Sequence, residues 1–161
     1  MMPIRLPFLL AVALLAGCSN IPLSESANTS RPMIEQIDTT RDGTSTAATV
    51  DSYKADLAQR IYAVNSTQVY TTRPQALLRS VVVLKYTVDG GGNLVRSEIA
   101  RSNHDRATEA TALATLRKSA PFPKPSPHLL RNGRLEMHES WLFNNDGRFQ
   151  LRSLALVQMD E

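Results

Sequence analysis

The segment of residues 80–100, SVVVLKYTVDGGGNLVRSEIA, constrains the fold more than any other part of the chain. Its first half is rich in β-branched residues and alternates apolar with polar side chains, which is typical of a strand with one buried face. Residues 89–93, DGGGN, tolerate the positive φ angles of a tight turn, and a second alternating run follows them. The segment therefore predicts a β-hairpin. A glycine-rich phosphate loop would instead lead into a helix.

A second hairpin is expected near the end of the chain. Its first strand alternates apolar and polar residues but is interrupted by Glu139, and residues 144–147, NNDG, predict a turn. Its second strand is expected to run over residues 148–157. The residues expected on the apolar face of these two strands are Leu135, Met137, Trp141, Phe143, Phe149, Leu151, Ala155 and Val157.

Two amphipathic helices are expected, one before the first hairpin and one between the hairpins. The first is indicated by four apolar residues at helical spacing, beginning close to Asp51. These residues are Tyr53, Leu57, Ile61 and Val64. The second helix is expected to begin in residues 102–105, where an acid follows a serine by three positions, as in a capping box. Its expected packing residues are Ala110, Leu113, Ala114 and Leu116.

The proline-rich segment of residues 120–127, APFPKPSP, has two interpretations. It can be a rigid connector from the second helix to the next strand, with Phe122 in the core, or a polyproline ligand for an SH3-like partner. We favour the connector. The resulting order of helix, strand, strand, helix, strand, strand predicts an α+β fold, a two-layer sandwich in which an antiparallel sheet of two hairpins carries the helices on one face.

Cys18 is the only cysteine in the chain, so it cannot form an internal disulfide, and no nearby histidine or second cysteine completes a metal site. Before it lie an apolar run, residues 6–15, and the small residues Ala16 and Gly17. A membrane-spanning helix needs roughly 20 apolar residues, whereas a secretory signal needs fewer. The run therefore predicts a signal peptide.

Residues 15–18, LAGC, resemble the lipobox of bacterial lipoproteins. The resemblance implies that residues 1–17 are removed and that Cys18 carries a diacylglyceryl group and becomes the first mature residue. Each acyl CH2 adds about 0.8 kcal/mol of membrane affinity, so several chains anchor a protein durably. Ser19, in the position after the cysteine, favours the outer over the inner membrane by the same resemblance. An unlipidated signal peptide with an incidental cysteine is the alternative.

Residues 18–50 are expected to form a flexible, lipid-anchored tether between the membrane and a domain of residues 51–161. The tether sequence has no aromatic residue and is dominated by serine, threonine and small or charged residues, so it buries too little apolar surface to fold. As a random coil it would span on the order of 30 Å. Alternatively, Met33, Ile34 and Ile37 form a short contact with the domain.

Residues 53–143 resemble the periplasmic C-terminal domain of TonB and the related TolA-type domains. The resemblance lies in the hairpin VVVLKYTVDGGGNLVRSEIARSN, the alanine-rich helix that an aspartate opens, DRATEATALATLRKSAPFPKP, and the strand MHESWLFNNDG. It implies a protein-binding domain of the cell envelope. Where many family members have a tryptophan before a proline, this chain has Val69, Tyr70 and Pro74. Energy transducers of the family also have a helix that spans the inner membrane, for which residues 6–17 are too short.

Charge and residue patterns argue against several other functions. The net charge of +3, which becomes +2 without Arg5, is small, and the basic residues are too scattered for nucleic-acid binding. His104, His128 and His138 are separated by a helix and a loop in the expected fold, and no nucleophile motif or pair of carboxylates stands out. The sequence therefore predicts no enzyme, no bound metal and no cofactor.

The remaining interpretation is a protein-binding lipoprotein whose exposed sheet edge accepts an extended peptide as an added strand. Arg148, Gln150 and Arg152 lie on the polar face of the expected last strand, where they could attract an acidic peptide from an envelope protein, or merely keep the edge soluble. Two alternatives remain. One is a structural envelope-assembly lipoprotein, and the other is an energy transducer for outer-membrane transport that keeps residues 1–17 as its anchor.

Overall fold

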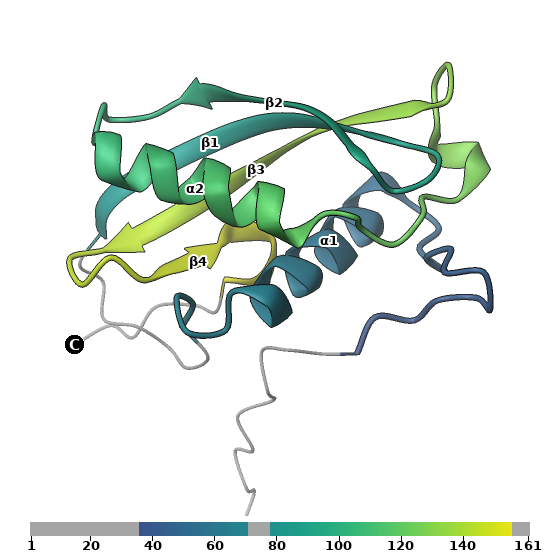
Figure 1. Cartoon of the computed structure of the whole chain (residues 1–161), viewed down its shortest axis with the longest axis horizontal. Helices are drawn as coiled ribbons and strands as arrows, with labels where there is room; N and C mark the ends of the chain where they lie inside the picture. Colours follow the sequence, from purple (N-terminus) through teal and green to yellow (C-terminus); the bar gives the residue numbers. More distant parts are fainter. Residues whose placement is uncertain (1–35, 71–77, 156–161) are drawn as a thin grey trace, which may run out of the picture.

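The computed structural model describes residues 36–70 and 78–155. Figure 1 shows two long helices and an antiparallel sheet, in the predicted chain order αββαββ. The elements are α1 (Val50–Val64), β1 (Leu78–Asp89), β2 (Leu94–Arg101), α2 (Arg106–Ser119), the 3-10 helix η1 (Pro127–Leu129), β3 (Arg134–Asn144), β4 (Phe149–Leu151) and the 3-10 helix η2 (Arg152–Leu154).

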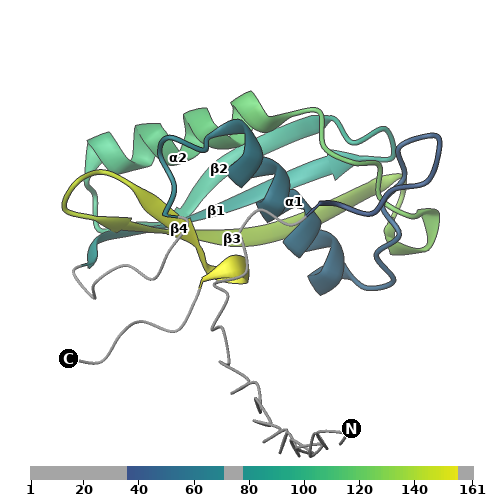
Figure 2. The same cartoon turned by 90° about the horizontal axis from the view of Figure 1, so that it is seen from below.

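The four strands form one sheet in the order β2-β1-β3-β4, and every neighbouring pair is antiparallel. β1 and β2 form one hairpin, and β3 and β4 form the other. The buried residues of both helices share a single core with one face of the sheet, and Figure 2 shows the layer that α2 forms above it. The predicted α+β sandwich with helices on one face is therefore confirmed.

β1 lies inside the sheet, and its side chains alternate between buried and half-buried from Ser80 to Asp89, after two exposed residues at its start. The buried set is the one that the sequence predicts: Val82, Leu84, Tyr86 and Val88. On β3, Trp141 lies opposite Val82 and is fully buried, and its Nε1 donates a hydrogen bond to Thr115 Oγ1 at 3.1 Å. The inward placement of Met137, Trp141 and Phe143 is confirmed as well.

The turn between β1 and β2 is fixed by Asp89 and Gly92. Asp89 Oδ1 accepts hydrogen bonds from the N–H groups of Gly91 and Asn93 at 2.8 and 2.9 Å. Gly92 has a φ of +81°, and a Cβ atom there would lie 2.2 Å from the backbone oxygen of Phe122. The N–H of Phe122 donates to Gly92 O at 2.9 Å. The turn therefore holds the proline-rich connector, and only glycine fits at its contact point.

We expect Gly92→Ala to lower the free energy of unfolding by about 3 kcal/mol or more, because it adds a steric clash to an unfavourable φ. Gly147→Ala is the matched control. Gly147 also has a positive φ, +79°, but a Cβ there would meet no atom within 4 Å. The control should lose only about 1–2 kcal/mol. Urea unfolding of both variants measures the difference, and equal losses would contradict the contact with Phe122.

α2 is present as predicted, but its cap and its buried face differ from the prediction. Asp105 is the N-cap, with its Oδ1 accepting from the N–H groups of Ala107 and Thr108, whereas Ser102 lies outside the helix. Serine and threonine can be buried in this helix because their hydroxyls donate to the helix's own carbonyls. The buried residues are Thr108, Ala112, Thr115, Leu116 and Ser119, while Ala110 and Ala114 are exposed and Leu113 is half-buried.

Structure begins before Asp51, within the stretch that the sequence assigns to the tether. Thr44 forms a parallel bridge with Lys124, Ser45 is 1% exposed, and the Ser45 hydroxyl donates to Asp56. Burial is the main reason that the pKa of Asp56 is raised.

The proline-rich segment is the predicted connector with Phe122 in the core, since Phe122 is 4% exposed.

Residues 1–35, including Cys18, Met33 and Ile34, lie outside the described residues, whereas Ile37 is half-buried. Among the helices of the described ranges, none is both long and apolar enough to span a membrane. The signal peptide and its lipidation site remain predictions.

Candidate functional site

β3 has a neighbouring strand along the whole of one side but along only part of the other. On the first side, β1 pairs with it from Arg134 to Asn144. On the second side, β4 pairs only with Trp141, Leu142 and Phe143. The part of β3 before Trp141 therefore has no strand beside it there, within residues 36–70 and 78–155.

The hydrogen bonds at the two ends of β3 show which residues face this side. The N–H of Asn144 donates to Arg148 O at 2.9 Å, and the N–H of Arg134 donates to Arg131 O at 3.1 Å, both away from β1. In an antiparallel ladder, successive residues point their N–H and C=O groups to opposite sides. The even-numbered residues between these ends therefore also direct their backbone groups away from β1.

Three of these residues, Glu136, His138 and Ser140, form what we call the open edge of β3. The hydrogen-bonded pair of Arg131 and Arg134 closes it at one end, and β4 closes it at the other. Glu136 and His138 make no backbone hydrogen bond on this side to any described residue. The open edge thus offers backbone donors and acceptors at the repeat of an extended strand.

Glu139 occupies part of the open edge. It belongs to the inner face of β3, opposite Leu84, and is 4% exposed. Its Oε1 accepts a hydrogen bond from the N–H of Ser140 at 2.7 Å, while its Oε2 has no hydrogen-bond partner among the described residues. Its carboxylate therefore occupies the position from which a neighbouring strand would otherwise accept the hydrogen bond of the Ser140 N–H. The sequence signal for this was the charge that interrupts the apolar alternation.

The second strand of this hairpin is shorter than predicted. β4 comprises Phe149–Leu151, and the chain then turns into η2, while residues 156–161, including Val157, lie outside the described residues. The prediction of a strand over residues 148–157 is therefore wrong in its length. The N–H of Leu151 donates to the Tyr62 hydroxyl at 3.0 Å. A side chain of α1, and not a further strand, therefore accepts this backbone hydrogen bond.

The structure does not place Arg148, Gln150 and Arg152 together on one exposed strand face. Arg148 lies in the turn before β4, where it pairs with Asp146 at 2.8 Å and stacks 4.2 Å above the ring centroid of Tyr70. Gln150 is 3% exposed, and Arg152 is exposed in η2. The hydrogen bond from the Tyr70 hydroxyl is the main reason that the pKa of Asp146 is lowered to about 2.

The outer side of β4 is also covered. Phe149 forms a parallel bridge with Val69, its N–H donates to Gln68 O at 2.9 Å, and its carbonyl accepts from the N–H of Tyr70 at 3.1 Å. A peptide would have to displace this segment before adding to β4. The partner-binding role of the arginines remains a prediction, but the edge on which it relied is occupied at Phe149.

β2 is the opposite edge of the sheet, and two irregularities interrupt it. Its pairing with β1 leaves Val95 and Ala100 as extra residues, one near each end of the strand. Such bulges twist an edge and hinder the addition of another strand. Although Val95 and Ile99 are 45% and 38% exposed, the regular part of β2 is short. We therefore regard the open edge of β3, and not β2, as the better candidate for the addition of a peptide strand.

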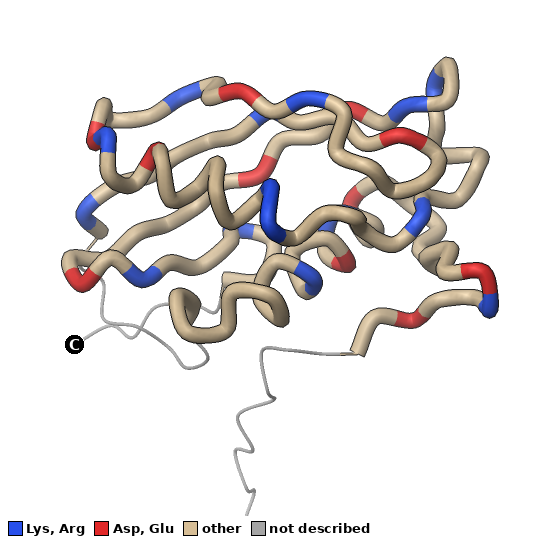
Figure 3. Tube along the Cα trace, viewed as in Figure 1, with Lys and Arg blue, Asp and Glu red and all other residues tan. Residues whose placement is uncertain are grey.

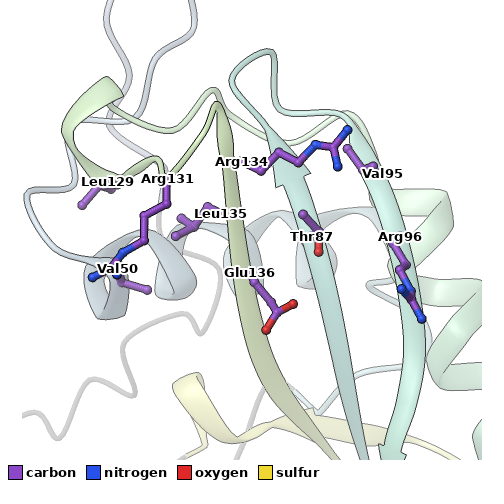
Figure 4. A pocket seen from close by; sticks show the side chains of 9 residues that line it. All are labelled: Val50, Thr87, Val95, Arg96, Leu129, Arg131, Arg134, Leu135 and Glu136. Atoms are coloured by element: carbon purple, nitrogen blue, oxygen red, sulfur yellow. The ribbon is translucent and has the colours of Figure 1, made fainter.

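A cavity of about 540 Å³ lies at the Arg134 end of the open edge (Figure 4). Figure 4 shows Leu135 and Arg131 on one side of β3 and Arg134 on the other. Glu136 pairs with Lys85 at 3.1 Å, whereas Arg131 and Arg134 form no ion pair within the described part of the chain. The cavity therefore combines apolar surface with unpaired positive charge.

The three histidines lie apart in the structure. His104 and His138 are exposed, and His128 Nε2 lies 3.0 Å from the carbonyl oxygen of Ala48. The described ranges contain no group of three or more histidine, cysteine or acidic side chains that could hold a metal. Figure 3 shows basic and acidic residues interspersed along the trace, without a continuous basic stripe over the described elements.

Comparison with known proteins gives one partial match. Over 71 residues, the chain is 30% identical to Protein TonB of Pseudomonas putida. The match covers 44% of this chain and 29% of that protein, so the chain spans less than a third of its relative. No protein-family model matches the chain, and no solved structure gives a significant match. This part of the chain is thus similar to a TonB protein.

Proposed function

We propose that this chain is a periplasmic lipoprotein, anchored to a membrane by acylated Cys18, whose folded domain binds an extended segment of an envelope protein as an added strand. The open edge of β3 carries the proposal, because Glu136 and His138 leave their outward backbone groups without partners in the described structure. An extended peptide binds such an edge through its main chain and gains specificity from adjacent pockets.

The geometry of the open edge suits a short added strand. Its residues alternate, so their outward groups recur about every 7 Å, as they do in a peptide strand. One end lies next to the cavity of Figure 4, where the side chains of a bound peptide can enter. The other end of the open edge meets β4, so a bound peptide would lie beside β3 and continue the line of β4.

The similarity to Protein TonB and the lipobox-like residues 15–18 support the envelope location. The same similarity is the observation that favours the second candidate, an energy transducer for outer-membrane transport with residues 1–17 uncleaved. A structural lipoprotein that holds an envelope assembly would use the same binding edge. All three functions require a protein partner, so the binding edge can be tested before the choice between them.

The test uses the full chain and a phage-displayed library of random peptides as the probe. We expect the selected peptides to protect the amides of Glu136 and His138 from hydrogen exchange. We further expect His138→Pro to weaken their binding about tenfold or more, because it removes an outward N–H and places a ring at the edge. The N–H of His138 takes no part in the β1–β3 ladder, so the melting temperature should change much less than the affinity.

His138→Ala is the matched control, since it removes the side chain but keeps the backbone donor. It should bind the selected peptides nearly as well as the wild type does. Exchange on the wild type gives an answer even where the proline variant folds poorly. Protection of β2 amides instead, or equal binding by the proline and alanine variants, would refute strand addition at the open edge.

A further inference from the structure

A second cavity, of about 460 Å³, lies at the Ser140 end of the open edge. Val83, His138 and Ser140 line it from the helix-free face of the sheet. Three basic side chains from three different elements also line it: Lys54 of α1, Arg101 of β2 and Arg152 of η2. The cavity therefore joins the open edge to a cluster of positive charge.

None of these three basic residues forms an ion pair with a described residue. The other charged residue that lines the cavity is Glu139, whose Oε1 already accepts from Ser140. Its Oε2 is buried and has no partner among the described residues. The cavity is thus lined by more positive than negative charge, and a buried acceptor that lacks a donor belongs to one of its lining residues.

We propose that this cavity binds an acidic residue, aspartate or glutamate, of the peptide that adds to the open edge. The inference rests on the proposed function and specifies the chemistry of the partner. The side-chain carboxylate of an acidic residue neutralises this basic cluster.

Other residue types fit this cavity less well. A lysine or arginine would face three positive charges against the single charge of Glu139, and like charges disfavour a partner strongly. An apolar residue would remove the basic groups from water without pairing them, which opposes binding. Asparagine has the shape of aspartate but lacks its charge. The comparison of these two residues therefore isolates the electrostatic part of recognition.

The experiment starts from a synthetic peptide that binds the full chain and protects the amides of Glu136 and His138. Each position of this peptide is replaced in turn by aspartate, asparagine and lysine, with both peptide ends blocked. At the peptide position that enters this cavity, we expect the aspartate peptide to bind about tenfold more tightly than the asparagine peptide, and the lysine peptide to bind least. The preference should shrink as the salt concentration rises, because part of the basic cluster is accessible to solvent.

Lys54→Ala and Arg152→Ala should each reduce the preference for aspartate while the asparagine peptide binds as before. Lys118→Ala and Arg117→Ala are the matched controls, since they remove the same charges from exposed positions on α2. Equal affinities for aspartate and asparagine at every position, with the edge amides still protected, would overturn the acidic pocket and leave strand addition intact. A preference for lysine would overturn it too. Loss of amide protection with every peptide would refute the proposed function itself.

Discussion

Trp141→Ala should lower the free energy of unfolding by about 3–5 kcal/mol, because it leaves a large cavity at the centre of the core. Trp141 is fully buried on β3, and β1 and β4 pair with it on either side. A small domain has a total stability of about 5–15 kcal/mol, so the variant loses a large part of it. Urea unfolding followed by far-UV circular dichroism measures the loss, since the substitution removes the chain's one tryptophan.

Trp141→Phe separates packing from hydrogen bonding. It keeps most of the ring volume but loses the donor to Thr115 Oγ1, so we expect a smaller loss of about 1–2 kcal/mol. The Thr115 hydroxyl retains its own acceptors, Thr111 O and Ala112 O. Wild-type stability of Trp141→Ala would mean that the register of β3 is wrong by one residue, because a one-residue shift exchanges the two faces of a strand.

Cys18→Ser should release the protein from the membrane fraction into the soluble periplasmic fraction. Serine cannot take the thioether-linked diacylglyceryl group, and each lost acyl chain removes several kcal/mol of membrane affinity. Fractionation of the cells and intact mass of the wild type measure the result. The wild-type mass should correspond to a chain that begins at residue 18 and carries acyl groups.

Ser19→Ala is the matched control for this experiment, because it changes the neighbouring hydroxyl but leaves Cys18 in place. It should remain in the membrane fraction. A Cys18→Ser protein that stays in the membrane with residues 1–17 still attached would contradict the lipoprotein. That outcome would favour the energy transducer with an uncleaved anchor.

The first hairpin could be predicted from the sequence because β1 is buried on one face only. Its alternation of Val82, Leu84, Tyr86 and Val88 reports directly which side faces the core. α2 could not be predicted to the same detail. Its buried face includes serine and threonine, whose hydroxyls are satisfied within the helix, so apolar spacing alone does not identify that face.

The open edge of β3 could not be predicted, because it depends on where another strand ends. Phe149, Leu151 and Ala155 alternate as a longer strand would, but a hydrogen bond from Leu151 to Tyr62 ties the chain to α1. The two residues are 89 positions apart, and no local pattern connects them. Glu139 was the one local sign of an unusual site, although its contact with Ser140 required the structure.

If Cys18 is acylated as we propose, the bridge between Thr44 and Lys124 sets how far the domain can extend from the membrane. A chain anchored at Cys18 would be connected to the membrane only by the residues before this bridge, and their full extension would span at most about 85–95 Å. The thermal average would be about 25–30 Å. A tensile load from the anchor would enter the domain beside the start of α1, through the hydrogen bonds of Gly43 and Ser45 with Lys124. Partners embedded in that membrane would then be within reach, and breaking this bridge would lengthen the connection between the membrane and the domain.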